Sequence, residues 1–320
     1  MTLRLTARTL DRPREIGYCD GPMHRLLAFV LLIGLVSFDW ATSAAAQEAV
    51  HFPSLDGPSL GSGDGAPPTQ LDGYLFRPTK QLPGPAPAVV FLHGCGGLIS
   101  GLSHQIMSRE MDWARHLNAQ GFVVLMVDSF TPRGSGEMCS QSGFKLWLYM
   151  KRPADAYGAL AFLQSQPAIA RDKVALIGWS NGGGAVLFAL GKRPGKPAAF
   201  AGPDFRAAIA FYPGSCDVQR VGADWTTSVP LLILQGEKDV WTPAKPCKAL
   251  ADQAAALGGP VEFHAYPGAY HDFDWPNLKR KELTSYTTSK GVVPITGEDP
   301  AAHADAIKRV QAFLASHLSL

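Results

Sequence analysis

The chain has 320 residues, of which 46% are hydrophobic, so it is long enough to bury a sizeable core. Its 29 Lys and Arg residues nearly balance 27 Asp and Glu residues, which gives a formal net charge of +2. So small an excess, without a long basic block, argues against a nucleic-acid-binding groove, and the sequence shows no internal repeat or heptad pattern.

The beginning of the chain is typical of an export signal. The apolar run at 26–38 is too short to span a membrane comfortably, and the small residues Ala44-Ala45-Ala46 follow it as a cleavage site. We interpret residues 1–46 as an N-terminal extension plus a signal peptide that is cut after Ala46, with Met23 as the expected start of translation. The alternative is an uncleaved N-terminal anchor. Cleavage predicts a periplasmic or secreted protein without a stable membrane anchor.

Residues 47–70 are rich in Gly, Pro, Ser and Asp, and we expect them to form an extended arm ahead of a domain at 71–320. In that domain short apolar runs alternate with segments of helical spacing, which predicts an α/β fold with a mostly parallel central sheet and helices on both faces. Two long connections, 128–151 and 276–299, interrupt the alternation, and such loops are usually functional or mobile. The expected strands are 71–77, 88–92, 122–127, 173–178, 207–212, 230–235 and 261–266, and the expected helices are 104–119, 153–165, 181–190, 243–257 and 300–318.

The sequence Gly-Trp-Ser-Asn-Gly at 178–182 places Ser180 between an expected strand and an expected helix. A serine hydroxyl is a poor nucleophile until a base takes its proton. A sharp strand-to-helix corner exposes the hydroxyl at the carboxyl end of the sheet, and the helix N-terminus favours the negative charge that develops nearby. We interpret Ser180 as a catalytic nucleophile. The alternative is a plain structural turn.

An acid and a histidine follow in the chain order of an α/β-hydrolase triad. Asp239 stands in the loop after the strand at 230–235, and we prefer it to Glu237 because the loop needs length to turn the carboxylate back; a solvated Asp is the alternative. His271 follows the strand at 261–266, whereas His264 lies within that strand and is expected to pack. In this hypothesis His271 takes the serine proton and Asp239 orients the imidazole.

The oxyanion hole is expected to combine the backbone N–H groups of Cys95 and Asn181. Cys95 lies in the glycine-rich sequence His-Gly-Cys-Gly-Gly that follows the strand at 88–92, and Asn181 follows the proposed nucleophile. His93 could act as a base or metal ligand, although a loop-orienting role suits its position better.

These motifs together resemble the dienelactone hydrolase family of α/β-hydrolases. The resemblance rests on HGCGG, VDSFTPRG, GWSNGGG, GEKDVWTP and AYHDFD in this order, and it covers roughly residues 70–318. It implies an α/β-hydrolase fold and hydrolysis of an ester or lactone without a metal or organic cofactor. The enzymes that give the family its name carry a cysteine at the position of Ser180, so the resemblance supports the fold and triad more strongly than dienelactone as the substrate.

Five residues are candidates for substrate binding. Trp179, Trp241 and Trp275 each stand beside a proposed triad residue, and some of them could line an apolar pocket. Arg133 could bind a substrate carboxylate through its two-pronged guanidinium, and Tyr270 is a further candidate. Packing under the loops is the alternative for the tryptophans, and for Arg133 the alternative is an ion pair that anchors its own loop.

Four cysteines remain after removal of the leader, and an exported chain meets an oxidising compartment that favours disulfides. Four cysteines allow three connectivities. Our hypothesis pairs Cys95 with Cys139, which would tie the 128–151 connection to the oxyanion loop, and Cys216 with Cys247, which would brace the loop of the acid.

The leading interpretation is therefore a serine esterase or lactonase acting on a small molecule, with no nucleic-acid partner and with an oligomeric state that the sequence leaves open. A peptidase or acyltransferase with the same triad is a second interpretation. An inactive hydrolase-like binding protein is a third, which the presence of all three triad residue types disfavours.

Overall fold

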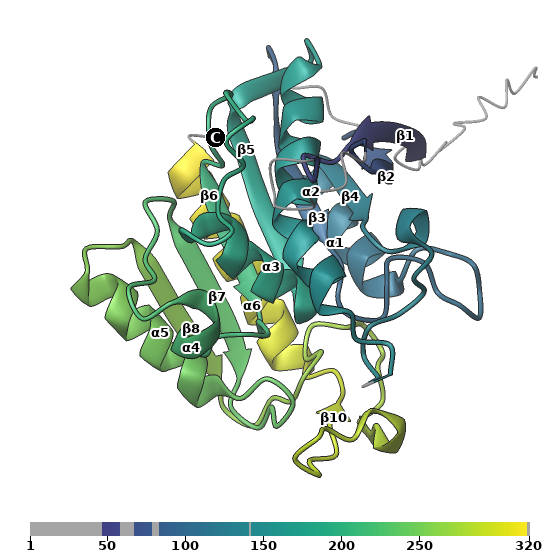
Figure 1. The fold of residues 1–320 in the computed structure, drawn as a ribbon, viewed down its shortest axis with the longest axis vertical. Coiled ribbons are helices and arrows are strands. Elements are labelled where there is room, and N and C mark those ends of the chain that lie inside the picture. Colours follow the sequence, from purple (N-terminus) through teal and green to yellow (C-terminus); the bar gives the residue numbers. More distant parts are fainter. Residues whose placement is uncertain (1–46, 58–66, 79–82, 141, 319–320) are drawn as a thin grey trace, which may run out of the picture. The chain divides into compact units, whose positions relative to one another are not determined.

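A twisted sheet of eight strands runs through the computed structural model (Figure 1), which describes residues 47–57, 67–78, 83–140 and 142–318. The strand order is β1-β2-β4-β3-β5-β6-β7-β8. All pairs from β4 to β8 are parallel, whereas β1 and β2 add an antiparallel edge. The bounds are β1 Gln47–Pro53, β2 Gln70–Phe76, β3 Ala86–Leu92, β4 Val123–Asp128, β5 Ile169–Trp179, β6 Ala207–Phe211, β7 Leu231–Gly236 and β8 Val261–Tyr266.

Helices cover both faces of the sheet, as the alternating pattern predicts. One core cluster packs α2, α3 and α5 against one face, and a second packs α1 and α6 against the other. In Figure 1, α6 (yellow) passes behind the strands while α3 lies in front of them. The helices are α1 Ser108–Asn118, α2 Leu146–Ser165, α3 Asn181–Leu190, α4 Val218–Val221, α5 Ala244–Ala256 and α6 Pro300–Leu318, with short 3-10 turns η2 Thr131–Arg133 and η3 Thr284–Tyr286.

The inner parallel strands are mainly apolar because helices cover both of their faces, whereas the edge strand β8 is mostly not buried. Every residue of β4, β6 and β7 is buried. By contrast, β1 has only Val50 and Phe52 buried, as expected for an edge strand that packs on one side. Loops that follow β3, β5, β7 and β8 meet at the carboxyl edge of the sheet, where a ligand site is expected in an open α/β sheet.

Two parts of the chain differ from the sequence-based expectation. Residues 47–53 of the expected arm form β1, which pairs with β2 over its whole length. Helix α2 begins at Leu146 rather than at residue 153, so Pro153 lies inside the helix instead of at its first turn. The 276–299 connection contains only a two-stranded ribbon, β9 Lys281–Glu282 with β10 Ile295–Thr296, and η3.

The proposed signal peptide at 1–46 lies outside the described residues. In the part of the chain that the structure describes, no helix has both the length and the apolar character needed to cross a membrane.

Candidate active site

Ser180 occupies a strained corner between β5 and α3. Its backbone angles, φ 52° and ψ −110°, are unusual for a residue other than glycine and are typical of a nucleophile elbow. The flanking glycines are required by close backbone approach: a Cβ on Gly178 would meet the carbonyl of Gly182, and a Cβ on Gly182 would meet the carbonyls of Leu92 and His93. The corner therefore holds Ser180 beside the loop that follows β3.

His271 and Asp239 form a buried pair at the ends of β8 and β7. His271 Nδ1 lies 2.6 Å from Asp239 Oδ2, and the two residues are 1% and 3% exposed. An ionised carboxylate only accepts hydrogen bonds, so Nδ1 carries the proton and Nε2 keeps a free lone pair. The other carboxylate oxygen of Asp239 accepts the N–H groups of Trp241 and Thr242 at 2.8 and 2.9 Å, which fixes its orientation.

The surroundings of His271 raise its pKa above the usual 6.5. Burial alone would lower this pKa, but the negative charges of Asp239 and Asp272 and the hydrogen bond to Asp239 outweigh burial and the opposing charge of Arg109. The imidazolium form is therefore stabilised, as a base that must hold a proton during a reaction requires.

Ser180 and His271 line the same cavity, which has a volume of about 230 Å³. A second cavity of about 420 Å³ also opens on Ser180, and Asn181 rather than His271 lines it. Trp241 and Tyr286 border both cavities and stack on each other with ring centroids 5.8 Å apart. The 276–299 connection thus forms one wall of the site; its residues in the smaller cavity are Leu278, Lys281, Leu283, Tyr286 and Thr296.

The loop after β3 presents backbone N–H groups beside Ser180. His93 Nδ1 donates to the carbonyl of Gly94 at 2.7 Å, and the N–H of Ser129 donates to His93 Nε2 at 3.3 Å. These contacts show that His93 orients the loop. Among the described residues, the N–H groups of Cys95 and Asn181 have no hydrogen-bond partner, as donors of an oxyanion hole require.

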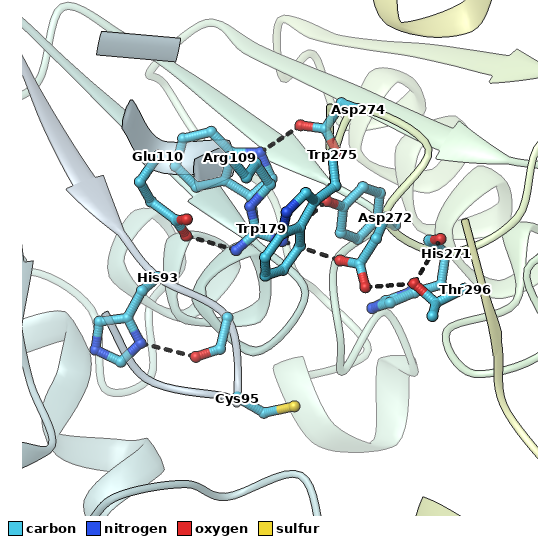
Figure 2. A network of polar contacts seen from close by, with 12 residues as sticks. His93, Cys95, Arg109, Glu110, Trp179, His271, Asp272, Asp274, Trp275 and Thr296 are labelled. Carbon is cyan, nitrogen blue, oxygen red and sulfur yellow. Dashed lines mark hydrogen bonds and ion pairs between the residues drawn. The ribbon is translucent and has the colours of Figure 1, made fainter. Parts of the chain in front are cut away.

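A buried ionic cluster lies next to His271 (Figure 2). Arg109 pairs with Glu110 Oε1 at 2.5 Å and with Asp272 Oδ1 at 2.9 Å. Asp274 is fully buried and accepts hydrogen bonds from Trp113, Trp179 and Tyr212. The sequence-based interpretation left Arg109 and Glu110 unassigned, because nothing in the first turn of a helix signals that the turn faces the histidine loop.

Three of the expected substrate contacts are corrected by the structure. Trp179 is fully buried, stacks on Phe211 and donates its indole N–H to Asp274, so it is a core residue. The Arg133 guanidinium is held by ion pairs at 2.6–3.0 Å to two buried carboxylates, which leaves none of its fork for a substrate. Tyr270 lies between Lys238 and Arg280 and is outside both cavities. Of the five candidates, Trp241 and Trp275 border the site.

Both hypothesised disulfide pairs are bonded in the structure. Cys95–Cys139 joins the loop after β3 to the 128–151 connection, and Cys216–Cys247 joins the segment after β6 to α5. The first bond borders both cavities at Ser180, whereas the second is buried. No group of three or more His, Cys, Asp or Glu side chains suited to a metal ion occurs within the described ranges.

A serine at a strained corner after the central strand, a histidine after β8 and an acid after β7 match the arrangement of an α/β-hydrolase. The family model of the dienelactone hydrolase family matches residues 71–318, and the chain belongs to this family. It is therefore a hydrolase that acts on ester bonds. A search of curated proteins finds no match.

Solved structures share the fold at low sequence identity. A dienelactone hydrolase-like promiscuous phosphotriesterase from metagenomic libraries superposes with a TM-score of 0.58 at 21% identity, covering 85% of this chain and 99% of that one. Esterase 2 of the Planctomycetes species Thermogutta terrifontis superposes with a TM-score of 0.54 at 15% identity, covering 85% and 92% of the two chains.

Proposed function

We propose that the protein is an exported serine hydrolase that cleaves a carboxylic ester or lactone through Ser180, His271 and Asp239. The observation that carries this proposal is the 2.6 Å contact between His271 and Asp239 beside a cavity that His271 shares with Ser180. The names of the structural neighbours, an esterase and a phosphotriesterase, agree with ester cleavage.

The reaction follows from the proton positions. Ser180 Oγ attacks the carbonyl carbon while His271 Nε2 takes the hydroxyl proton, and Asp239 stabilises the resulting imidazolium without itself taking the proton. The C–O bond to the alcohol then breaks, and His271 gives its proton to the leaving oxygen. Water attacks the acyl-enzyme by the same route, which releases the acid and restores Ser180. With a lactone the alcohol stays attached to the acyl group.

Two backbone donors stabilise the tetrahedral intermediate in this proposal. The N–H groups of Cys95 and Asn181 point the positive ends of two peptide dipoles at the oxyanion, and loss of one such donor typically costs ~10²–10³ in rate. Asn181 is the first residue of α3, so the helix dipole adds to the same effect.

The two cavities suggest how a substrate lies across Ser180. The leaving oxygen must reach His271, so we propose that the alcohol part occupies the cavity of about 230 Å³ that His271 lines. The acyl part then extends toward the cavity of about 420 Å³ on the Asn181 side. Trp241 contacts both parts because it borders both cavities.

Export is the second part of the proposal. Two disulfide bonds, at Cys95–Cys139 and Cys216–Cys247, suit an oxidising compartment such as a periplasm or the extracellular space. The leader-like sequence at 1–46 supports the same compartment.

The test is hydrolysis of p-nitrophenyl esters of short acids by the purified protein and by Ser180→Ala. We expect wild-type turnover and a loss of about 10⁴-fold or more in the variant, because no other group supplies the attacking oxygen. Ser228→Ala is the matched control, since Ser228 precedes β7 at the opposite end of the strands. Equal activity of Ser180→Ala and wild type would reject the proposal.

A further inference from the structure

Arg152, in helix α2, is a buried cation whose direct hydrogen-bond partners are neutral oxygens. Its side chain is fully buried, and among the described residues it forms no ion pair. Two other arginines with buried side chains, Arg109 and Arg133, each pair with two carboxylates. The charge of Asp155 raises the pKa of Arg152 through space, but Asp155 pairs directly with Arg133 instead. A buried charge without a direct ion pair is costly, so the position of Arg152 points to a role other than stability.

The guanidinium of Arg152 joins the two segments that carry the proposed oxyanion donors. Its Nη2 donates to the carbonyl oxygen of His93 at 2.8 Å, and its Nη1 donates to the side-chain oxygen of Asn181. The rigid, planar fork fixes the separation of its two acceptors, which a flexible side chain would not do. The ring of Phe130 lies 5.1 Å from the guanidinium carbon and completes its pocket.

Arg152 is also linked to the backbone N–H of Cys95 through His93. Arg152 binds the carbonyl of His93, and the His93 ring binds the peptide group that joins Gly94 to Cys95. Gly94 C=O and Cys95 N–H belong to the same planar trans peptide, so they point in opposite directions. His93 holds that carbonyl through its Nδ1–H at 2.7 Å, a contact drawn in Figure 2. Burial first, and then the charge of Arg152, keep the pKa of His93 well below its usual value, so the ring stays neutral and keeps the tautomer this contact needs.

We propose that Arg152 is a positioning residue of the oxyanion hole, which aligns both N–H donors and adds a fixed positive charge behind them that favours a negative substrate oxygen. Electrostatic stabilisation of this kind is strong in a site that excludes water and costs no rearrangement during the reaction. Burial lowers the pKa of Arg152 to about 10, so the side chain is still charged at neutral pH. This inference rests on the proposed serine-hydrolase function.

Kinetics of Arg152→Met and Arg152→Lys, with Arg133→Lys as the matched control, test the inference. For folded Arg152→Met we expect kcat to fall by ~10²-fold with KM within about threefold of wild type, since the lost interaction acts on the transition state. Arg152→Lys keeps the charge but cannot bridge both acceptors, so it should recover part of kcat. Arg133→Lys should keep kcat within about twofold of wild type while its melting temperature falls.

Two further readouts separate positioning from general stability. An alkyl boronic acid forms a tetrahedral adduct with serine. Its inhibition constant should rise in Arg152→Met by the same factor by which kcat falls. The labelling rate of Ser180 by a fluorophosphonate should fall in parallel. A purely structural arginine would change the folded fraction and leave both values unchanged in the molecules that remain folded.

The outcomes distinguish this inference from the proposed function. If wild type labels and hydrolyses esters while folded Arg152→Met matches it in kcat and labelling, the role of Arg152 is wrong and the serine-hydrolase proposal stands. If Arg152→Met does not fold, a wild-type kcat in Arg152→Lys overturns the role instead. If wild-type protein neither labels nor hydrolyses any ester, the proposed function fails and the inference fails with it.

Discussion

The candidate triad residues are held by neighbours that no short motif contains. Thr242 is the clearest case: its hydroxyl oxygen lies 2.8 Å from Asp239 Oδ2 and 2.9 Å from the carbonyl oxygen of Tyr212, either of which can accept its single proton. The same oxygen lies 3.2 Å from His271 Nδ1. The rings of Tyr212 and Trp241 lie 4.5 and 4.9 Å from the imidazole. The histidine is thus restricted by two aromatic neighbours and at its donor nitrogen, which lowers the cost of aligning it for proton transfer.

The raised pKa of His271 predicts a particular pH dependence. The imidazole must be neutral to accept the serine proton, so kcat/KM should rise with pH through a pKa above 6.5. Asp272→Asn removes one of the charges that raise this pKa and should move the acid limb of the profile to lower pH. The profiles of the two proteins, measured with one ester, provide the check. An unshifted limb in folded Asp272→Asn would contradict the assigned electrostatics.

The raised pKa of His271 affects folding stability and activity in opposite directions: as the pH rises, activity should increase while the contribution of His271 to stability decreases. A histidine whose pKa is raised on folding stabilises the fold fully below its unfolded pKa, and this contribution disappears as the pH rises through the folded value. The pH range in which His271 is an active base is therefore the range in which its charge no longer stabilises the protein.

At the residue scale, the sequence was sufficient for groups whose position follows from local context. Ser180, Asp239 and His271 each follow a strand, and parallel strands bring such loops to one edge. Arg152 was not predictable, because a helical arginine is normally solvent-exposed and its contacts come from segments 29 and 59 residues away. For Arg133 the sequence left substrate binding and an ion pair that anchors its loop both open, because its carboxylate partners Asp56 and Asp155 lie far away in the sequence.

At the scale of elements, helix α2 shows why boundaries were harder to predict than strands. Pro153 lacks a backbone N–H, so the sequence favoured a helix that begins there. The helix instead starts at Leu146 and buries Leu148 and Tyr149 in the core, with the Tyr149 ring 5.5 Å from that of Phe188. Tertiary packing of this earlier part outweighs the local preference of proline, whereas continuous apolar strands carry their own signal.

The 276–299 connection predicts how substrate size is controlled. Tyr286 stacks on Trp241 where the two cavities meet, so Tyr286→Ala should open the wall beside the alcohol cavity. We expect kcat/KM for esters of bulky alcohols to rise by ~10-fold relative to methyl esters. Paired measurements on methyl and benzyl esters of one acid give this ratio. A ratio unchanged from wild type would show that Tyr286 does not limit the site.

The two disulfides predict different losses. Replacing both Cys216 and Cys247 with serine should lower the free energy of unfolding by about 2–4 kcal/mol, the typical effect of a native cross-link, while the folded protein stays active. The Cys95→Ser/Cys139→Ser variant should lose kcat as well, because the disulfide no longer holds the backbone N–H of residue 95, a proposed oxyanion donor, in place. Denaturant unfolding of both double variants measures the loss of stability, and ester kinetics measure the loss of kcat. Full kcat without the Cys95–Cys139 bond would contradict its proposed bracing of the loop.

At the scale of the whole molecule, two core clusters on opposite faces of one sheet account for the α/β class that the alternating pattern predicts. Strand β1 was missed because it has only two buried side chains, too few to give an alternating signal beside a Gly- and Pro-rich segment. The sequence therefore predicted the helical layers on both faces of the sheet and the edge at which the candidate site lies, but not strand β1 at the end of the sheet.

Export predicts the composition of the mature chain. If the leader is cut after Ala46, the secreted protein begins at Gln47 and carries two disulfides. Intact-mass analysis of protein recovered from the periplasm or medium, with and without reductant, measures both properties. A mass that retains residues 23–46, or four free thiols in the native protein, would contradict the proposed processing and compartment.

The most direct test of the central claim is to locate a fluorophosphonate adduct by peptide mapping of the folded wild-type protein. The proposed mechanism predicts one adduct per chain, on Ser180, absent from Ser180→Ala and slowed at acidic pH where His271 is charged. An adduct on a different residue, or no adduct on folded protein at a pH where His271 is neutral, would contradict the assignment of Ser180 as the nucleophile.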